Sequence, residues 1–401
     1  MKIAHLCLAC FYIEGYEYQE NILPRKHKQS GNEVTIITSQ YSFDENKNEY
    51  DRSVGDYMNV DNIPVTVLGY DQRYKKFSRA FRLYTGLFDK LQEIKPDIIF
   101  CHGTQFLSIC ELIKYKKRNT QVRIISDQHI DHVNSGVLLS YKRRLQHRFF
   151  WGYFARKAAK YSEIIWGVTP LRVTFLRDIY RIPAAKTGLL VMGGDDDKID
   201  FRNKERIRRR LREQHEIAND DFLIVTGGKI DEAKNTHLLM RAVAKINYSK
   251  MKLVVFGQPS AAMKQEIDAL SQHDCIRNIN WIPSEEVYNW FLAADLAVFP
   301  GTHSVLWEQA CACGTPCVFK YWEGMTHVNV GGNCRFLYRD CAEEIEEVLL
   351  RVFSHPEEYK NMKKAAMENG VKEFSYSEIA RRSIDPFYEF GGIVLDKKNR
   401  R

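Results

Sequence analysis

The amino-acid sequence lacks long apolar runs, internal repeats and low-complexity segments, and it holds only 11 prolines in 401 residues. Because no run approaches 18 apolar residues, the sequence predicts no membrane span. With 44% hydrophobic and 27% charged residues, the composition is that of a globular protein. At this length we expect two domains of roughly 200 residues each.

The N-terminus also lacks the features of a secretory signal. The segment "MKIAHLCLACFYI" has one basic residue, a histidine within its apolar part and no A-x-A cleavage pattern. We therefore predict that it is the first β-strand of a cytoplasmic protein. The formal net charge of +8 favours anionic partners, such as nucleotides, phosphates, nucleic acid or an acidic lipid surface.

The ten cysteines are scattered. Cys7 and Cys10 have the spacing of a metal or redox motif, but residues three apart in one strand point to opposite faces. We therefore predict that their thiols do not converge. Cys311, Cys313 and Cys317 are expected to be separated in the same way between a helix and a strand. Buried free thiols in a reducing cytoplasm are the favoured interpretation.

Three consecutive aspartates, Asp195 to Asp197, contain the D-x-D pattern of a metal site. They follow the segment "GLLVM" through two glycines. That position favours a solvated turn between domains over a metal site.

Short β-rich segments alternate with helical segments such as 234–247 and 284–293 along the whole chain. This alternation predicts the α/β class, with two doubly wound parallel-sheet domains. We expect an N-terminal Rossmann-like domain over 1–194, a second one over 195–375, and a helix over 376–401 that returns to the first domain before a basic tail. Ligands of such sheets bind at the carboxyl ends of strands. The predicted strands are "KIAHLCL", "EVTIIT", "PVTVLG", "DIIFCH", "VRIISD", "EIIWGV", "GLLVM", "FLIVTG", "KLVVFG", "IRNINWI", "LAVF" and "TPCVF".

Two segments combine basic and aromatic residues. Residues 141–160 hold seven Lys or Arg, six aromatic residues and no acid, and residues 73–90 place Phe77, Phe81, Tyr84 and Phe88 at helical spacing. The aromatic rings could be core beneath a solvated charged face. They could also form a face that rests on an anionic membrane, with rings at headgroup depth. Nucleic acid is a weaker alternative, because no nucleic-acid-binding module accompanies the charge.

The segment "VTGGKIDEAKN" (225–235) predicts a strand, a glycine turn and the start of a helix. Gly227 and Gly228 permit a close backbone approach at the end of the strand. Lys229 and Lys234 lie on either side of a short loop, so both ammonium groups can meet at one anion. Two lysines in this position suit a diphosphate.

The segment "PGTHSVLWEQACACGTP" (300–316) follows the strand "LAVF" and places one carboxylate, Glu308, near a helix start. Ser304 is the predicted N-cap, so Glu308 falls four residues later and not at the third position that a capping box requires. A carboxylate there could accept both hydroxyls of a ribose. His303 lies in the same turn, where it could face a ligand or simply solvent.

These motifs, in this order, resemble the retaining glycosyltransferases of family 4, which have the GT-B fold. The resemblance runs over most of the chain. It rests on "GKIDEAKN", on the strand–proline–turn–helix segment with Glu308, on A-x-x-x-G-T-P, on the opening "MKIAHLCLACFYIEG…GNEVTIITS", and on "INWIPSEEVYNWFLAADLAVFP".

The resemblance implies roles for particular residues. Lys229 and Lys234 would hold the donor diphosphate, Glu308 would bind ribose, and His129 would be the active-site histidine near the transferred sugar. Asp127 and His132 are close rivals of His129, and the acceptor side would include them with Glu14 and Tyr16. The remaining donor-side residues would be Gly15, Gly228, Gly257, Ile282, Pro283, His303, Ser304, Val305, Gly324, Met325 and Thr326.

Three features depart from the family pattern. Counting eight residues back from Glu308 gives Pro300 in place of the first glutamate of the family's E-x7-E motif. The opening loop has one glycine where the family has a pair, and Lys229 stands where the family has arginine. A lysine is a point-like partner that lacks the planar fork of arginine.

The sequence therefore predicts a retaining glycosyltransferase that uses a UDP- or GDP-sugar, needs no metal or other cofactor, and acts on a glycan or lipid-linked glycan acceptor. We expect a cytoplasmic protein with a peripheral contact to the anionic inner membrane surface, and no nucleic-acid partner. Two alternatives are a nucleotide-sugar 2-epimerase of the same architecture and a catalytically inactive GT-B partner subunit. A metal-dependent GT-A enzyme built on Asp195 and Asp197 is a weaker one.

Overall fold

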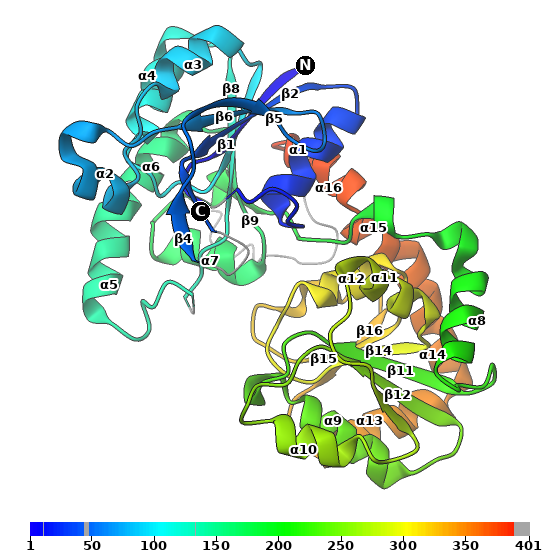
Figure 1. Ribbon diagram of the computed structural model, residues 1–401. Coiled ribbons are helices and arrows are strands. Elements are labelled where there is room, and N and C mark those ends of the chain that lie inside the picture. The colour runs from blue at the N-terminus through cyan, green and yellow to red at the C-terminus, as the bar shows by residue number, and fades with distance from the viewer. Residues whose placement is uncertain (11, 44–47, 133, 389–401) are drawn as a thin grey trace. The chain divides into compact units, whose positions relative to one another are not determined.

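The computed structural model describes residues 1–10, 12–43, 48–132 and 134–388. The chain forms two compact units (Figure 1). Unit 1 comprises Met1–Val191 and the described chain from Ala380 onward, and unit 2 comprises Met192–Ile379. The sequence predicted unit boundaries at residues 195 and 376, and the structure has them at Met192 and Ala380. The predicted basic tail falls at 389–401, outside the described residues.

Unit 1 is built on a sheet with the strand order β10-β9-β8-β7-β1-β2-β6-β5, in which only the edge strand β5 runs antiparallel to its neighbour. The central strand β7 is buried along its whole length, as expected for a parallel sheet covered on both faces. The strands are β1 Lys2–Cys7, β2 Glu33–Ser39, β5 Gly55–Met58, β6 Pro64–Leu68, β7 Ile98–His102, β8 Arg123–Gln128, β9 Ile164–Gly167 and β10 Thr187–Leu189, with a separate pair β3 Tyr41–Phe43 and β4 Glu49–Asp51.

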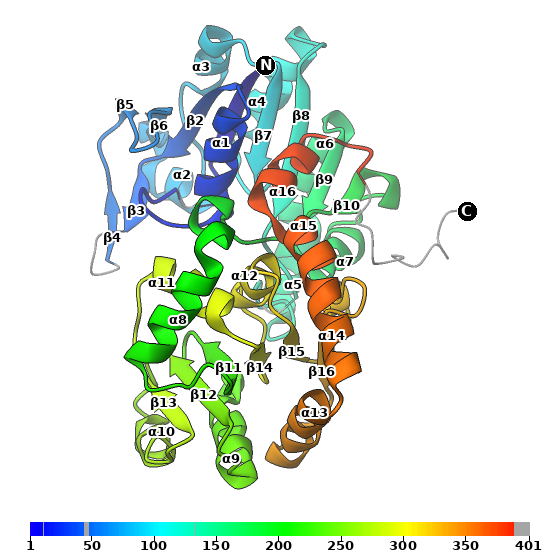
Figure 2. The same cartoon turned by 90° about the vertical axis from the view of Figure 1, so that its right-hand side faces the viewer.

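Helices lie on both sides of this sheet (Figures 1 and 2). Their apolar stripes pack on the strands; Leu112 of α4 and Leu91 of α3, for example, belong to one buried cluster with Leu6 and Ile99. The helices are α1 Gln19–Gln29, α2 Lys75–Phe81, α3 Leu87–Ile94, α4 Ile109–Arg118, α5 Tyr141–Leu145, α6 Gly152–Tyr161 and α7 Pro170–Asp178.

Unit 2 has a wholly parallel sheet of order β13-β12-β11-β14-β15-β16. Its core joins strand residues such as Ile224 and Val298 to Leu239 of α9 and Leu349 of α13. The strands are β11 Phe222–Gly227, β12 Met251–Phe256, β13 Ile276–Asn278, β14 Leu296–Phe299, β15 Cys317–Lys320 and β16 Cys334–Leu337. The helices are α8 Lys204–Gln214, α9 Thr236–Ile246, α10 Lys264–Leu270, α11 Ser284–Ala293, α12 Leu306–Ala312, α13 Ala342–Ser354, α14 Pro356–Ala365 and α15 Val371–Phe374.

The helix α16 (Tyr376–Ser383) carries the chain back to unit 1, where it lies beside α1 in both views (Figures 1 and 2). Three side chains of unit 1 hold its end. His27 Nε2 lies 2.9 Å from the Ala380 carbonyl, Trp166 Nε1 donates to the Ser383 carbonyl at 2.9 Å, and Arg123 donates to the Ile384 carbonyl at 2.9 Å.

The predicted helix over 73–90 is wrong, because the chain makes two helices there. The first, α2, ends at Arg82, which is in the left-handed region, and Gly86 with φ of 85° precedes α3. Tyr84 between them forms a β-bridge with Tyr70. Side-chain periodicity alone does not reveal such a break.

The prediction that paired cysteines stay apart is also wrong. Strand β1 ends at Cys7, so the chain turns before Cys10, and the two thiols are hydrogen-bonded. Cys317 of β15 likewise bonds Cys311 of α12. Burial raises the pKa of the Cys10 and Cys317 thiols, so each stays protonated. All ten cysteines are free thiols.

The aspartate turn at 195–197 lies next to the boundary between the units, but it is not fully solvated. The side chain of Asp195 is buried and accepts a hydrogen bond from the Asp197 backbone, which caps a short 3-10 turn. Asp196 accepts from the Ser377 backbone at 2.6 Å. These two carboxylates therefore serve the local chain geometry.

Candidate functional site

Two turns at the carboxyl ends of β11 and β14 are joined in unit 2. The Thr302 amide donates to the Ala233 carbonyl at 2.9 Å, and the Asn235 side chain donates to the Pro300 carbonyl at 3.2 Å. A Cβ on Gly301 would lie 2.3 Å from the Lys234 backbone carbon. Only glycine therefore allows this approach, and sequence analysis did not single out Gly301.

Lys234 holds the second turn in place. Its Nζ donates to the carbonyls of Thr302 at 2.7 Å and His303 at 3.0 Å. An ammonium group has three N–H donors, so one remains for a ligand. Partial burial lowers the pKa of Lys234, and nearby Lys229 lowers it further while Asp231 opposes the change.

Lys229 is placed near Lys234, but it is much more exposed. Its side chain is 75% exposed and pairs with Asp231 at 3.0 Å. A surface ion pair of this kind is weak, so the ammonium group can leave it at little cost. The two lysines predicted at this loop are thus a partly buried anchor, Lys234, and an exposed surface cation, Lys229.

The helix α12 begins one residue later than predicted. Val305 is its N-cap, so Ser304 does not cap it. Glu308 then falls at the third helical position, where a capping box would have its acid, but Val305 has no side-chain oxygen to complete the box. The carboxylate of Glu308 is free to bond elsewhere.

Glu308 bonds two histidines. Its side chain is fully buried, and Oε1 lies 2.8 Å from His303 Nε2 and 2.9 Å from His327 Nε2. Oε2, also buried, has no hydrogen-bond partner among the described residues. The structure thus shows Glu308 buried between two histidines, and its role as a ribose ligand stays a prediction.

The charges at this cluster fix the tautomer of His303. Burial alone would raise the pKa of Glu308, but His303 and His327 outweigh it and lower the pKa to about 2. The ionised carboxylate accepts only, so the Nε2 atom of His303 carries a proton. In the neutral ring Nδ1 is then an acceptor. The His303 side chain is 18% exposed, so this ring is partly accessible to a ligand.

Glycines bring the neighbouring backbone close to the same strand ends. Gly228 has φ of 105°, and a Cβ on Gly257 would lie 1.8 Å from the Gly228 carbonyl oxygen. Of the other predicted donor-side residues, Ile282 and Pro283 lie just before α11, Ser304 and Val305 just before α12, and Gly324, Met325 and Thr326 in the loop after β15. Met325 is buried and Gly324 is exposed. His327 in this loop was missed, although it stands next to Thr326.

In unit 1, the predicted histidine His129 follows strand β8. Its Nε2 lies 3.4 Å from Oδ2 of Asp127, and the ring is 30% exposed. The same Asp127 oxygen accepts from the Gln19 side chain and from His102 Nδ1, both at 2.9 Å. Burial opposes the charge of Asp127, but His102 and His129 hold its pKa well below the usual range. Asp127 is wholly buried and cannot touch an acceptor directly.

The other acceptor-side residues are dispersed. Tyr16, in the loop after β1, is exposed and packs on Tyr18, and its neighbour Gly15, a predicted donor-side residue, has φ of 80°. Glu14 accepts from the Val60 amide at 2.8 Å. The ring of His132 packs against Phe175 at 5.2 Å.

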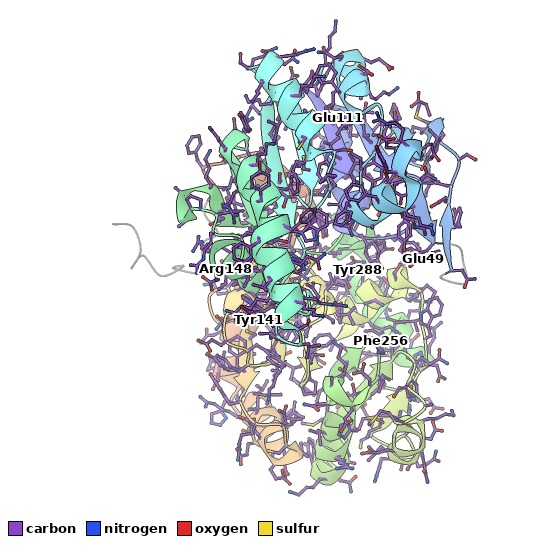
Figure 3. All side chains as sticks on the ribbon, turned by 90° about the vertical axis from the view of Figure 1, so that its left-hand side faces the viewer. Glu49, Glu111, Tyr141, Arg148, Phe256 and Tyr288 are labelled. Atoms are coloured by element: carbon purple, nitrogen blue, oxygen red, sulfur yellow. The ribbon has the colours of Figure 1, made fainter. Side chains whose placement is uncertain are left out.

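The basic aromatic segment 141–160 forms α5, a π-helical turn at Gln146–Trp151, and α6. Tyr141 is 74% exposed and Phe149 64%, whereas Trp151 is buried; Figure 3 labels Tyr141 and Arg148 on this helix. Phe150 packs on Phe81 of α2 at 5.1 Å, so the two basic aromatic segments meet. An open pocket of about 280 Å³ adjoins the helix and is lined by His132, Val137, Leu138, Arg144, Arg148, Asp178, Ile179 and Arg181.

Two clusters of the described chain place three potential metal ligands within 4.8 Å of one another: His303, Glu308 and His327, and His102, Asp127 and His129. Hydrogen bonds account for the contacts of His102, His303 and His327, whereas His129 Nε2 lies 3.4 Å from Asp127 Oδ2. Both nitrogens of His102 are engaged, and in the other cluster each imidazole Nε2 lies on the carboxylate. None of the described helices has the length and apolar character to span a bilayer.

Comparison with known proteins decides the fold. Residues 207–369 match the family described as "Glycosyl transferases group 1". A solved structure from Anabaena, Alr3699/HepE in complex with UDP, superposes with a TM-score of 0.64 at 15% identity, over 95% of this chain and 98% of that one. The chain has the GT-B fold. The predicted fold class is confirmed.

Sequence relatives of this GT-B protein are matched over part of their length. D-inositol 3-phosphate glycosyltransferase 1 of Catenulispora acidiphila is 25% identical over 194 residues, which are 44% of this chain and 46% of that protein. The Salmonella typhimurium lipopolysaccharide 1,2-N-acetylglucosaminetransferase is 30% identical over 140 residues, 31% of this chain and 35% of that protein. The matches thus span less than half the length of these curated relatives.

Proposed function

We propose that the protein is a retaining glycosyltransferase of family 4, which moves a sugar from a nucleoside diphosphate donor to a lipid-linked glycan. The observation that carries this proposal is the pair of joined turns at the ends of β11 and β14, where Lys234 organises the backbone and keeps one N–H for an anion. The match of 207–369 to the glycosyltransferase family and the fold shared with a UDP-bound structure support it.

The diphosphate is the leaving group, and its negative charge grows as the glycosidic bond breaks. Lys234 meets that charge from a fixed position, while Lys229 reaches it from the surface. Preorganised donors of this kind stabilise a transition state because they need no reorganisation during the reaction. The lysines supply positive charge without a metal ion.

His303 is the group that we assign to the transferred sugar, in place of the family's missing first glutamate. Glu308 holds its Nε2 proton and so presents Nδ1 as an acceptor for a hydroxyl. Glu308 is thus a positioning residue. His129 of unit 1, next to the buried Asp127, is the other histidine that the family resemblance assigns to the transfer reaction.

The acceptor is assigned to unit 1 and to an anionic membrane surface. Leu138 and Leu139 are 70% and 90% exposed beside the pocket that Arg144, Arg148 and Arg181 line. Arginines suit a phosphate, and exposed apolar side chains suit the lipid next to it. Flotation with liposomes tests this face: binding to anionic vesicles should fall as salt rises and should weaken in Arg144→Ala/Arg148→Ala. Equal binding to neutral vesicles would contradict it.

The decisive experiment has two stages. Thermal unfolding with a panel of nucleoside diphosphates and their sugars identifies the donor, since a ligand at 100 times its Kd adds about 2.7 kcal/mol of stability. Transfer to a membrane extract containing lipid-linked glycans is then measured, and the anomeric configuration of the product is determined by NMR. An inverted product would disprove retention. Rapid release of free nucleoside diphosphate without acceptor would favour the epimerase, and failure to bind any nucleotide would favour the inactive subunit.

A further inference from the structure

Another pocket, of about 220 Å³, lies in unit 1 and shares no lining residue with the pocket of Arg144, Arg148 and Arg181. Among its lining residues, Ser39 is the last residue of β2, and Tyr70 follows the end of β6. The pocket therefore lies at the carboxyl edge of the parallel sheet, where ligands of such sheets bind.

This pocket has a buried floor and an exposed rim. Tyr70 and Tyr84 in the floor are each 3% exposed, and their rings stack with centroids 5.4 Å apart. The Tyr84 hydroxyl donates to the Leu8 carbonyl at 3.1 Å, which fixes that ring. At the rim, the side chains of Glu49, labelled in Figure 3, and Arg79 are 58% and 41% exposed. A ligand can thus reach polar groups above a firm aromatic floor.

Tyr41 joins the polar groups of the rim into one network. The Arg79 guanidinium lies over the Tyr41 ring, 5.1 Å from its centroid, and pairs with Glu49 at 3.4 Å. The Glu49 carboxylate also accepts a hydrogen bond from the Tyr41 hydroxyl. A planar guanidinium and a carboxylate held in this way present donors and acceptors in fixed directions.

The charges around the pocket balance. Two arginines, Arg79 and Arg82, face the floor ring of Tyr70. Two acids, Glu49 and Asp51, face the same ring, and Arg79 pairs with both of them, at 3.4 Å and 3.7 Å. An anionic ligand would have to displace a carboxylate or lie against it, and like charges placed together are unfavourable. The pocket therefore suits an uncharged ligand.

The size and chemistry of the pocket indicate the class of that ligand. Its volume of about 220 Å³ is below the roughly 300–1,000 Å³ of sites for drug-sized molecules, so it suits a single ring. Tyrosine rings offer an apolar surface, and the guanidinium and carboxylate groups around them bind hydroxyls. A neutral sugar has both features, because its ring carries C–H groups on its faces and hydroxyls at its edge.

This pocket is also linked to the one assigned above to phosphate and lipid. Arg82 donates to the Gln105 carbonyl at 3.0 Å, and the Gln105 side chain donates to the Tyr180 hydroxyl at 2.7 Å. The neighbours of Tyr180 in the chain, Ile179 and Arg181, line the other pocket. Such a link suits the sugar and the phosphate of one lipid-linked acceptor.

We propose that this tyrosine pocket binds one neutral sugar residue of the acceptor glycan. Tyr41, Glu49 and Arg79 are then specificity residues, which admit a neutral sugar and exclude uronic acids and sugar phosphates. The binding of a neutral sugar follows from the pocket alone, whereas its place in the acceptor rests on the proposed function.

Saturation-transfer NMR tests the site without any donor. The probes are methyl glycosides of neutral hexoses and N-acetylhexosamines, with inorganic phosphate as the competitor. We expect a neutral glycoside to bind the wild-type protein and phosphate not to displace it. Displacement by phosphate, or no binding of any glycoside at millimolar concentration, would overturn the proposal.

A variant that fills the pocket locates the bound glycoside. Ala80 lines the pocket from the exposed face of α2, so Ala80→Leu adds bulk and removes no polar group. It should weaken glycoside binding about tenfold or more, which corresponds to about 1.4 kcal/mol. Ala262→Leu makes the same change at an exposed alanine of unit 2 and is the control. Thermal unfolding verifies that both variants fold, and equal affinity in the two would refute the proposal.

Glu49→Gln tests the charge balance. The amide keeps the size of the side chain and removes its charge, so methyl glucuronide should gain over methyl glucoside. We expect a gain of about two- to fivefold, as for a partly exposed ion pair. An unchanged preference would contradict the assignment of Glu49 as a specificity residue.

Transfer assays separate this inference from the proposed function. In Ala80→Leu the KM for the acceptor should rise about tenfold, and the KM for the donor should not change. An unchanged acceptor KM would overturn the acceptor assignment and leave the transferase standing. If the protein transfers no sugar but binds the glycoside, and Ala80→Leu weakens that binding, the proposed function fails and the sugar site stands.

Discussion

Both units contain a buried carboxylate next to two histidines, but the surroundings of that carboxylate differ. Each has a completely buried carboxylate with two imidazole nitrogens near one of its oxygens: Asp127 in unit 1 and Glu308 in unit 2. In each, the other carboxylate oxygen has no hydrogen-bond partner among the described residues. In both units one of the two histidines is partly exposed, His129 at 30% and His303 at 18%.

The two units differ in the hydrogen bonds that the buried histidine makes beyond the carboxylate. In unit 1 the buried ring, His102, passes its second nitrogen to His5 and through it to a backbone carbonyl. In unit 2 the cluster is short and is fixed to a turn that Lys234 holds. A buried carboxylate can thus lie next to a partly exposed histidine either at the end of a chain of buried rings or in a short cluster on a turn.

The largest effect is expected on stability. Asp127→Asn leaves the proton of His102 without its counter-charge, and breaking a buried pair costs about 3–5 kcal/mol. Glu308→Gln keeps an acceptor for two imidazoles, so we expect about 1–3 kcal/mol. Urea unfolding at pH 7.5 measures both, with the exposed carboxylate variant Asp274→Asn as control. A greater loss in Glu308→Gln would reverse the comparison.

Lys234→Ala should reduce turnover next most strongly. It removes a donor aimed at the leaving group, worth about 2.7–4 kcal/mol, and frees the carbonyls of Thr302 and His303. Lys229→Ala, at the same loop, is the matched comparison. We expect it to lower turnover by more than tenfold, but by less than Lys234→Ala does. Steady-state kinetics with the identified donor measures both. Near-normal rates in both variants would remove the lysines from the mechanism.

His303→Ala should lower turnover at least tenfold and leave the affinity for the bare nucleoside diphosphate within about twofold. Contacts to the sugar are realised mainly in the reacting complex, so kcat falls and nucleotide binding does not. Calorimetric titration with the nucleoside diphosphate supplies the second measurement. Should this variant turn over normally, the ring serves only the turn, and the exposed histidines of the two units are not equivalent.

The smallest effect is the pH dependence of stability, and its sign separates the units. The pKa of His102 is raised from 6.5 to about 9, so its contribution is complete below pH 6.5 and is lost as the pH rises through 9. The pKa of Glu308 is lowered from 4.5 to about 2, so its contribution is present above pH 4.5 and is lost as the pH falls through 2. Burial lowers the pKa of His27 to about 4, so unit 1 also loses stability as the pH falls from 6.5 through 4.

Unfolding free energies at a series of pH values test this pattern. The alkaline loss should disappear in His102→Gln and persist in Glu308→Gln. If both variants keep it, His102 is not the group whose charge is lost.

Sequence reasoning located the parallel strands because most are continuous apolar runs between turn residues. It missed β16, whose two middle residues, Arg335 and Phe336, are only partly buried. It also extended a helix through Tyr84, because aromatic side chains there continue a helical spacing while the backbone does not.

The sequence predicted individual residues of the candidate site but not the contacts between them. Lys234, His303 and Glu308 were chosen from local patterns, and the structure brings them to one turn. The partner that changes the role of Glu308 is His327, which lies 19 residues away in the chain. Gly301 matters only through its contact with Lys234. Such pairings depend on how strands are placed side by side, which local patterns do not encode.

The tie between α16 and unit 1 has a consequence for synthesis on the ribosome. Domains fold in order as the chain emerges, yet residues 1–191 appear long before Ala380 and Ser383. Until then His27 and Trp166 lack the carbonyls that accept their protons. Buried donors without acceptors are costly, so the first unit to be made cannot complete its interior until the second has left the ribosome. The nascent chain must therefore keep its first unit open to water through most of translation.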